Sequence, residues 1–220
     1  MSPISKYQTV IFDLDGTLID SAPGILHSFE NTLKRAGISP CVSLNESLIG
    51  PPLRQTLVNL TGITDDSELD TLVELFKDSY DTEGYRNTRV YDGVEELLKY
   101  LAARHIPMAI ATNKRRIPTL KIIELMKWDH YFQVIGTLDS NPSHANKAAL
   151  IGSLLGEMTV DAGTCVYIGD KREDGEAADA NQMPFIAVGW GYGEWGPEMM
   201  KPGWIHISTF VEAMETIIVE

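Results

Sequence analysis

The sequence predicts an α/β fold: a doubly wound, Rossmann-like parallel sheet with an inserted α-helical domain. Over the second half of the chain, short apolar runs typical of buried strands alternate with segments of helical periodicity, which is the pattern of βαβ units. Another apolar run, residues 10–12, stands near the N-terminus, and the long stretch that separates it from the others contains no convincing strand. A helical block inserted after the first strand of the sheet explains both observations.

The first half of the chain supplies this strand and then helices. The strand ends at Asp13, and a helix is expected to start after Asp20 or Ser21 and to end at Gly37. Further helices are separated by glycine and proline residues and are expected at 44–49, 53–60 and 67–80. We therefore expect a helical cap domain over residues 20–87 and a core domain made of residues 1–19 and 88–220.

Strands and helices alternate from residue 91 onward. The expected strands are short and apolar: 107–111, 132–135, 165–168, 185–188 and 204–207. The expected helices have one apolar face each: 94–101, 117–126, 146–155, 173–181 and 208–217. This order predicts a parallel sheet with helices on both faces.

Composition excludes several classes of protein. The chain has 220 residues, of which 44% are hydrophobic and 22% charged, as is typical of a globular protein with a sizeable core. Its net charge of -13 argues against nucleic acid and anionic membranes as partners. No apolar run approaches the ~20 residues that a membrane helix needs, and two cysteines are too few for a disulfide framework. We expect a cytoplasmic protein without a signal peptide, and either a monomer or a homodimer.

Polar residues follow three of the expected strands, where ligands bind in open α/β sheets. They are Asp13, the pair Thr112 and Asn113, and Asp170, with Asp174 at the start of the next helix. Asp15, two residues after Asp13, adds a carboxylate that repels the first, so the site must hold a cation or share a proton. Four carboxylates without a neighbouring Cys or His form a hard oxygen site suited to Mg²⁺.

This set of groups suits phosphoryl transfer, which needs positioning and charge neutralisation. Asp13 is the candidate nucleophile, because a metal and a cation can suppress its repulsion from a phosphate. Asp15 could protonate the leaving oxygen and then activate water. Lys147 starts a helix that could bring a fixed positive charge to the same edge. Lys114, Arg115 and Arg116, after Asn113, are expected at a solvated helix start, with a phosphate clamp as the alternative.

These residues resemble the sequence motifs of the haloacid dehalogenase-like superfamily. The motifs occur in the same order and extend over nearly the whole chain. Asp13-Leu14-Asp15-Gly16-Thr17 is similar to its nucleophile motif; its later motifs are matched by Thr112, Lys147, and Gly169-Asp170 with Asp174. The helical insert resembles the family's cap, and Ile49-Gly50-Pro51-Pro52-Leu53 resembles phosphoglycolate phosphatases. The sequence around Lys147 lacks the Lys-Pro pair common in those enzymes and is closer to relatives that act on nucleotides or other phosphates.

The resemblance implies a phosphatase for a small phosphorylated metabolite, with an aspartyl-phosphate intermediate on Asp13. It also implies Mg²⁺ held by Asp13, the backbone carbonyl of Asp15, Asp170 and Asp174, with Thr112 and Lys147 on the phosphate oxygens. Asn113 and Arg54 are further candidates for substrate binding.

Two alternatives remain open: a phosphomutase of the same fold, and a non-catalytic module that binds a phosphorylated ligand. The position of the mutase's cap histidine, twelve residues past the nucleophile, is Ile25 here, which favours hydrolysis. Loss of Asp13 or Asp15 would mark the non-catalytic module, and both are present.

Overall fold

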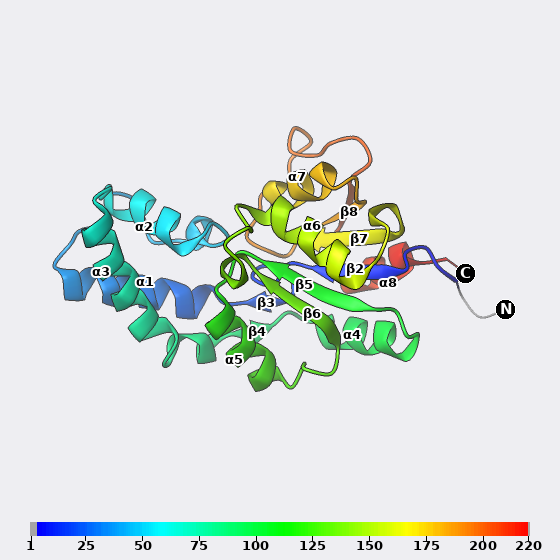
Figure 1. Ribbon diagram of the computed structural model, residues 1–220, viewed down its shortest axis with the longest axis horizontal. Coiled ribbons are helices and arrows are strands. Elements are labelled where there is room, and N and C mark those ends of the chain that lie inside the picture. The colour runs from blue at the N-terminus through cyan, green and yellow to red at the C-terminus, as the bar shows by residue number, and fades with distance from the viewer. Residues whose placement is uncertain (1–3, 220) are drawn as a thin grey trace.

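The computed structural model describes residues 4–219, and its centre is a six-stranded parallel sheet (Figure 1). The strand order is β6-β5-β2-β7-β8-β9. The strands are β2 (Thr9–Phe12), β5 (Met108–Thr112), β6 (Phe132–Thr137), β7 (Cys165–Gly169), β8 (Phe185–Val188) and β9 (Ile205–Ile207). All six strands predicted from the sequence are therefore confirmed, and the first of them lies inside the sheet between β5 and β7.

Helices cover both faces of this sheet, as the prediction requires. One face is covered by α4 (Val94–Ala103), α5 (Arg116–Met126) and α8 (Phe210–Ile217). The other face is covered by α6 (Lys147–Met158) and α7 (Arg172–Ala180). Side chains alternate along β2, so that Val10 and Phe12 pack on the first face and Ile11 on the second. Both faces are apolar, as in a buried parallel sheet.

Three helices form a cap at one end of the molecule (Figure 1). They are α1 (Ala22–Ala36), α2 (Leu53–Thr61) and α3 (Asp66–Tyr80), and they bury an apolar core of their own. The helix predicted at 44–49 is shorter in the structure, a 3-10 turn at Glu46–Leu48. The turn begins after Asn45, whose side chain accepts from the backbone N–H of Ser47, and Gly50-Pro51-Pro52 prevents it from continuing into a longer helix. The other 3-10 turns are Gly84–Asn87, Leu138–Ser140 and Ala162–Thr164.

Cap and core are joined by a small antiparallel ribbon of β3 (Ile19–Asp20) and β4 (Arg89–Val90). At the other end, β1 (Ile4–Ser5) pairs with β10 (Ile218–Val219). Strands of two residues are too short to leave a pattern in the sequence, and none of the four was predicted. We propose a division into a cap of residues 20–87 and a core of residues 1–19 and 88–220. The ribbon lies where the chain passes from core to cap and where it returns from cap to core. No helix in the described part of the chain is long and apolar enough to span a bilayer.

Candidate active site

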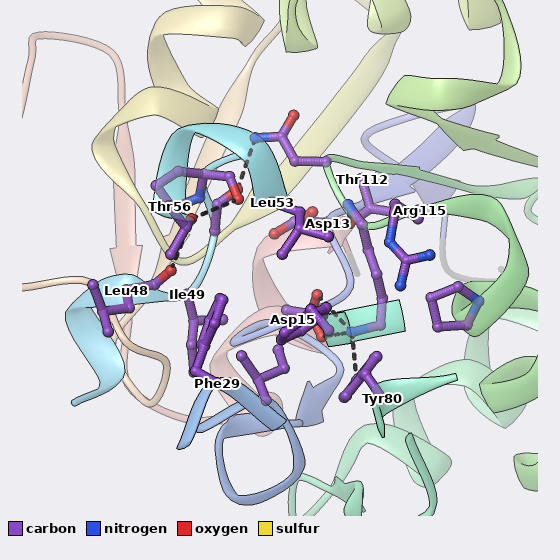
Figure 2. Close-up of a pocket in the computed structure, with 17 residues that line it drawn as sticks. Asp13, Asp15, Phe29, Leu48, Ile49, Leu53, Thr56, Tyr80, Thr112 and Arg115 are labelled. Carbon is purple, nitrogen blue, oxygen red and sulfur yellow. Dashed lines mark hydrogen bonds and ion pairs between the residues drawn. The ribbon is translucent and has the colours of Figure 1, made fainter. Parts of the chain in front are cut away.

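The central three strands bring polar groups to one edge of the sheet. Asp13 follows β2, Thr112 ends β5 and Asp170 follows β7, and β2 pairs with both neighbours in parallel. The carboxyl ends of adjacent parallel strands meet at one edge, which explains why residues so far apart in sequence lie together. All three side chains are buried. Figure 2 shows Asp13 and Thr112 in a cavity between this edge and the cap.

Three carboxylates gather at this edge. One oxygen each from Asp13, Asp170 and Asp174 lies within 4.8 Å of the others, and all three residues are buried. Burial, helped by the charges of Asp174 and Asp15 and opposed by Lys147, raises the pKa of Asp13 from 3.8 to about 6. Burial and the neighbouring carboxylates also raise the pKa of Asp170 well above its ordinary value. Oδ1 of Asp13 is buried and has no hydrogen-bond partner apart from the ion pair with Lys147 described next. Oxygen ligands with this excess of negative charge fit a divalent cation.

Lys147 is the cation of the acidic cluster. Its Nζ lies 3.1 Å from Oδ1 of Asp13 and also donates to Oδ1 of Asp174. Asn146 caps the helix that begins at Lys147, and its side chain accepts from the backbone N–H of Ala149. Burial alone would lower the pKa of Lys147, but the two carboxylates raise it well above its ordinary value. The ammonium group is therefore a fixed positive charge beside Asp13, at the place predicted for it.

Asp15 lies in a different set of contacts. Its carboxylate accepts a hydrogen bond from the Ser21 hydroxyl, and Lys114 Nζ lies 3.0 and 3.2 Å from its two oxygens. Lys114 also donates to the Tyr80 hydroxyl at 2.7 Å, at the end of α3. Only 5% of the Lys114 side chain is exposed, so the prediction of a solvated helix start is wrong for this residue. Its only signal in the sequence was its position two residues after Thr112.

Close backbone packing holds Asp170 in place. Gly16 has a φ of +83°, and a Cβ at this residue would overlap the Asp170 carboxylate. A Cβ at Gly191 would also overlap Asp170, so the loop after β8 can approach only as glycine. From this loop the Tyr192 backbone N–H donates to Oδ2 of Asp170 at 2.8 Å. The Tyr192 hydroxyl accepts from the backbone N–H of Ser21 at 2.7 Å and thereby fixes the start of the cap.

Thr112 and Asn113 line the cavity, as the sequence suggests for substrate-binding residues. The Thr112 hydroxyl accepts from the backbone N–H of Lys114 at 3.2 Å. The Asn113 amide donates to the Gly50 carbonyl of the cap at 2.9 Å, while its Oδ1 is buried without a partner. Asn113 therefore joins core to cap and has a free acceptor at the site.

Arg54 is not brought to the site. It lies on α2, where its guanidinium pairs with Asp66 and Asp70 of α3, and its side chain is 42% exposed. It is not among the residues that line the cavity, although its neighbour Leu53 is. The expected role in substrate binding is therefore not supported by its position.

The sequence that forms this site matches one protein family over most of the chain. The family described as haloacid dehalogenase-like hydrolase matches residues 10–188, which include Asp13, Thr112, Lys147, Asp170 and Asp174. The chain belongs to the haloacid dehalogenase-like hydrolases. The family and the fold predicted from the sequence are thereby confirmed.

Several curated proteins are similar to the chain. The tyrosine-protein kinase PtkA of Mycobacterium tuberculosis is 31% identical over 87% of the chain, and the chain spans 65% of the length of that protein. A 5'-nucleotidase of Pseudomonas aeruginosa is 33% identical, over 86% of the chain and 85% of the relative. A phosphoglycolate phosphatase of Pseudomonas fluorescens is 32% identical, over 86% of the chain and 71% of the relative.

Two solved structures agree with this fold. A predicted phosphatase from Clostridium acetobutylicum superposes with a TM-score of 0.82 at 29% identity, over 94% of this chain and 96% of its own. A predicted phosphoglycolate phosphatase from Haemophilus somnus superposes with a TM-score of 0.84 at 26% identity, over 96% and 98% of the two chains. Because both alignments span nearly the whole chain, they include the helical cap as well as the sheet.

Proposed function

We propose that this protein is a Mg²⁺-dependent phosphatase that hydrolyses a small phosphate monoester through an aspartyl-phosphate on Asp13. The observation that carries this proposal is the pairing of Asp13 with Lys147 at 3.1 Å inside the buried acidic cluster. A carboxylate beside a fixed ammonium group can receive a dianionic phosphate, whose charge would otherwise repel it. The names of similar family members, among them phosphoglycolate phosphatase and 5'-nucleotidase, support the same class of reaction.

The side chains divide the work of two displacements. A carboxylate oxygen of Asp13 attacks phosphorus, the bond from phosphorus to the ester oxygen breaks, and that oxygen takes a proton from Asp15. A water molecule then attacks the phosphorus of the aspartyl-phosphate, and Asp15 takes a proton from this water. The bond from phosphorus to the Asp13 oxygen breaks, so that phosphate leaves and the Asp13 carboxylate is regenerated. Thr112 and Lys147 hold the phosphate oxygens during both steps.

Asp13, Asp170 and Asp174, with the backbone carbonyl of Asp15, would hold the metal ion. The buried carboxylates and the raised pKa of two of them fit this assignment. When bound, the ion would neutralise negative charge on the phosphate oxygens, because the single positive charge of Lys147 does not balance a phosphate dianion. Mg²⁺ is the expected ion because the proposed ligands are all oxygens.

The test is phosphate release from p-nitrophenyl phosphate with and without Mg²⁺. We expect metal-dependent turnover that Asp13→Asn abolishes and Asp15→Asn lowers at least 100-fold. Asp129→Asn, at an exposed carboxylate outside the site, is the matched control and should leave turnover unchanged. An acid-quenched reaction should contain a phosphoryl group on Asp13 by mass spectrometry. Turnover that survives Asp13→Asn, or that a chelator does not affect, would contradict the mechanism.

The similarity to PtkA makes transfer to an acceptor other than water a second candidate. In that reaction the bond from the γ-phosphorus of ATP to the bridging oxygen breaks, and the phosphoryl group passes to a tyrosine hydroxyl instead of to water. Incubation with γ-labelled ATP and a protein acceptor tests the kinase: label on protein tyrosine would support it, whereas a phosphatase for small monoesters leaves no label there. A phosphomutase would instead return the phosphoryl group to a second hydroxyl of its substrate.

A further inference from the structure

The wall of the cavity on the cap side is apolar. It faces Asp15, the residue expected to protonate the leaving group of an ester bound at Asp13. It consists of side chains from α1, α3, the start of α2 and the segment before α2 (Figure 2). Its principal residues are Phe29, Ile49, Leu53, Phe76 and Tyr80. The rings form a continuous row, with centroids 4.6 Å apart between Phe29 and Phe76 and 5.5 Å apart between Phe76 and Tyr80.

The two cations in this cavity are already neutralised. Lys114 pairs with Asp15 inside the site, as described above. Arg115 forms a two-pronged ion pair with Asp81 at the end of α3, one arm measuring 2.8 Å, and both side chains are mostly buried. Among the described residues that line the cavity, no further Lys or Arg is present. A second negative charge on a leaving group that lies against this wall would therefore meet no unpaired cation. Lys171, which forms no ion pair among the described residues, lines the adjoining hollow on the other side of Gly50 and not this wall.

This combination of wall and charges selects against a charged leaving group. A carboxylate placed against these side chains would lose its hydration without gaining a partner, whereas an alkyl or aryl group would gain from burial. We infer that the site takes phosphate monoesters whose leaving group is uncharged and largely apolar, and that it discriminates against phosphoglycolate. This inference rests on the proposed phosphatase function and adds the class of substrate.

Two pairs of esters of matched size test the inference with the unmodified protein and Mg²⁺. The first pair is propyl phosphate and phosphoglycolate, and the second is phenyl phosphate and 4-carboxyphenyl phosphate. We expect kcat/KM to be at least tenfold higher for the uncharged member of each pair. In the aryl pair the carboxylate does not make the phenol a poorer leaving group, so a lower rate reports on the cavity. Equal or faster turnover of the carboxylate members would overturn the inference.

A charge introduced into the wall should reverse this preference. Leu53→Lys puts a cation at the half-buried start of α2 and should raise kcat/KM for phosphoglycolate while lowering it for propyl phosphate. Asn59→Lys adds the same charge at an exposed position of α2 and should change neither. Hydrolysis of p-nitrophenyl phosphate separates the two proposals. If it is absent, the phosphatase proposal fails; if it is present without discrimination between the pairs, the inference about the leaving group fails.

Discussion

Replacement of Asp13 by asparagine should abolish turnover and at the same time stabilise the metal-free protein at neutral pH. Burial is the main cause that raises the pKa of Asp13 to about 6 from 3.8. The folded protein therefore keeps the proton up to about pH 6, whereas the unfolded chain releases it near pH 3.8. As the pH rises through this window, the unfolded chain binds fewer protons than the folded one, and the free energy of unfolding falls.

The size of the effect follows from the two pKa values. The difference between 3.8 and about 6 corresponds to about 3 kcal/mol of lost stability once the pH exceeds 6. Asparagine at this position matches the protonated acid in charge. The variant should therefore be more stable by up to about 3 kcal/mol at pH 7.5 and by less than about 1 kcal/mol near pH 4. For a chain of this length, that gain is a rise in Tm of about 6–12 °C.

Urea unfolding of chelator-treated protein between pH 4 and 8 measures this difference. Added Mg²⁺ should narrow it, because a cation beside the carboxylate stabilises the wild-type protein and not the amide. Asp129→Asn, at an exposed carboxylate, should follow the wild-type curve at every pH. A gain that is the same at pH 4 and 7.5, or an Asp13→Asn variant less stable at pH 7.5, would refute the reasoning.

Three further substitutions test other parts of the site. Lys114→Met should lower kcat by about 10- to 100-fold, because Asp15 loses the ammonium group that orients it. Lys114→Arg should restore part of the rate. An unchanged kcat in Lys114→Met would contradict this role. Gly16→Ala should lower the free energy of unfolding by about 1–3 kcal/mol in thermal unfolding, because the backbone has a positive φ and the Cβ would overlap Asp170. Arg54→Ala should leave kcat and KM for p-nitrophenyl phosphate unchanged and alter stability by at most ~1 kcal/mol, because its ion pairs are exposed; a raised KM would return Arg54 to the site.

The sequence was most informative for residues whose position follows from the strand that precedes them. Asp13, Thr112 and Asp170 each follow an apolar strand, and the parallel sheet brings all strand ends of this kind to one edge. The same reasoning places Asp174, because it follows Asp170 at the start of α7. Their convergence could therefore be predicted without any knowledge of contacts between the domains.

Contacts between domains could not be predicted in this way. Lys114 is buried because it contacts Tyr80, 34 residues earlier in the chain, across the boundary between core and cap. Arg54 lies next in sequence to the cavity residue Leu53, but the helix turns its side chain toward α3. Helical periodicity identifies the apolar face of a helix but does not say which neighbour covers it. The residues that line the cavity on its cap side could therefore not be predicted from the sequence.

The contacts of Asp15 show how the cap can influence the chemistry as well as the choice of substrate. Ser21 stands at the start of α1 and Tyr80 at the end of α3, so the two ends of the cap's helical segment meet at this carboxylate, Ser21 directly and Tyr80 through Lys114. A shift of the cap that opens the apolar wall must also disturb these hydrogen bonds. Substitutions in that wall should therefore change kcat together with KM, whereas substitutions at exposed cap positions such as Arg54 should change neither.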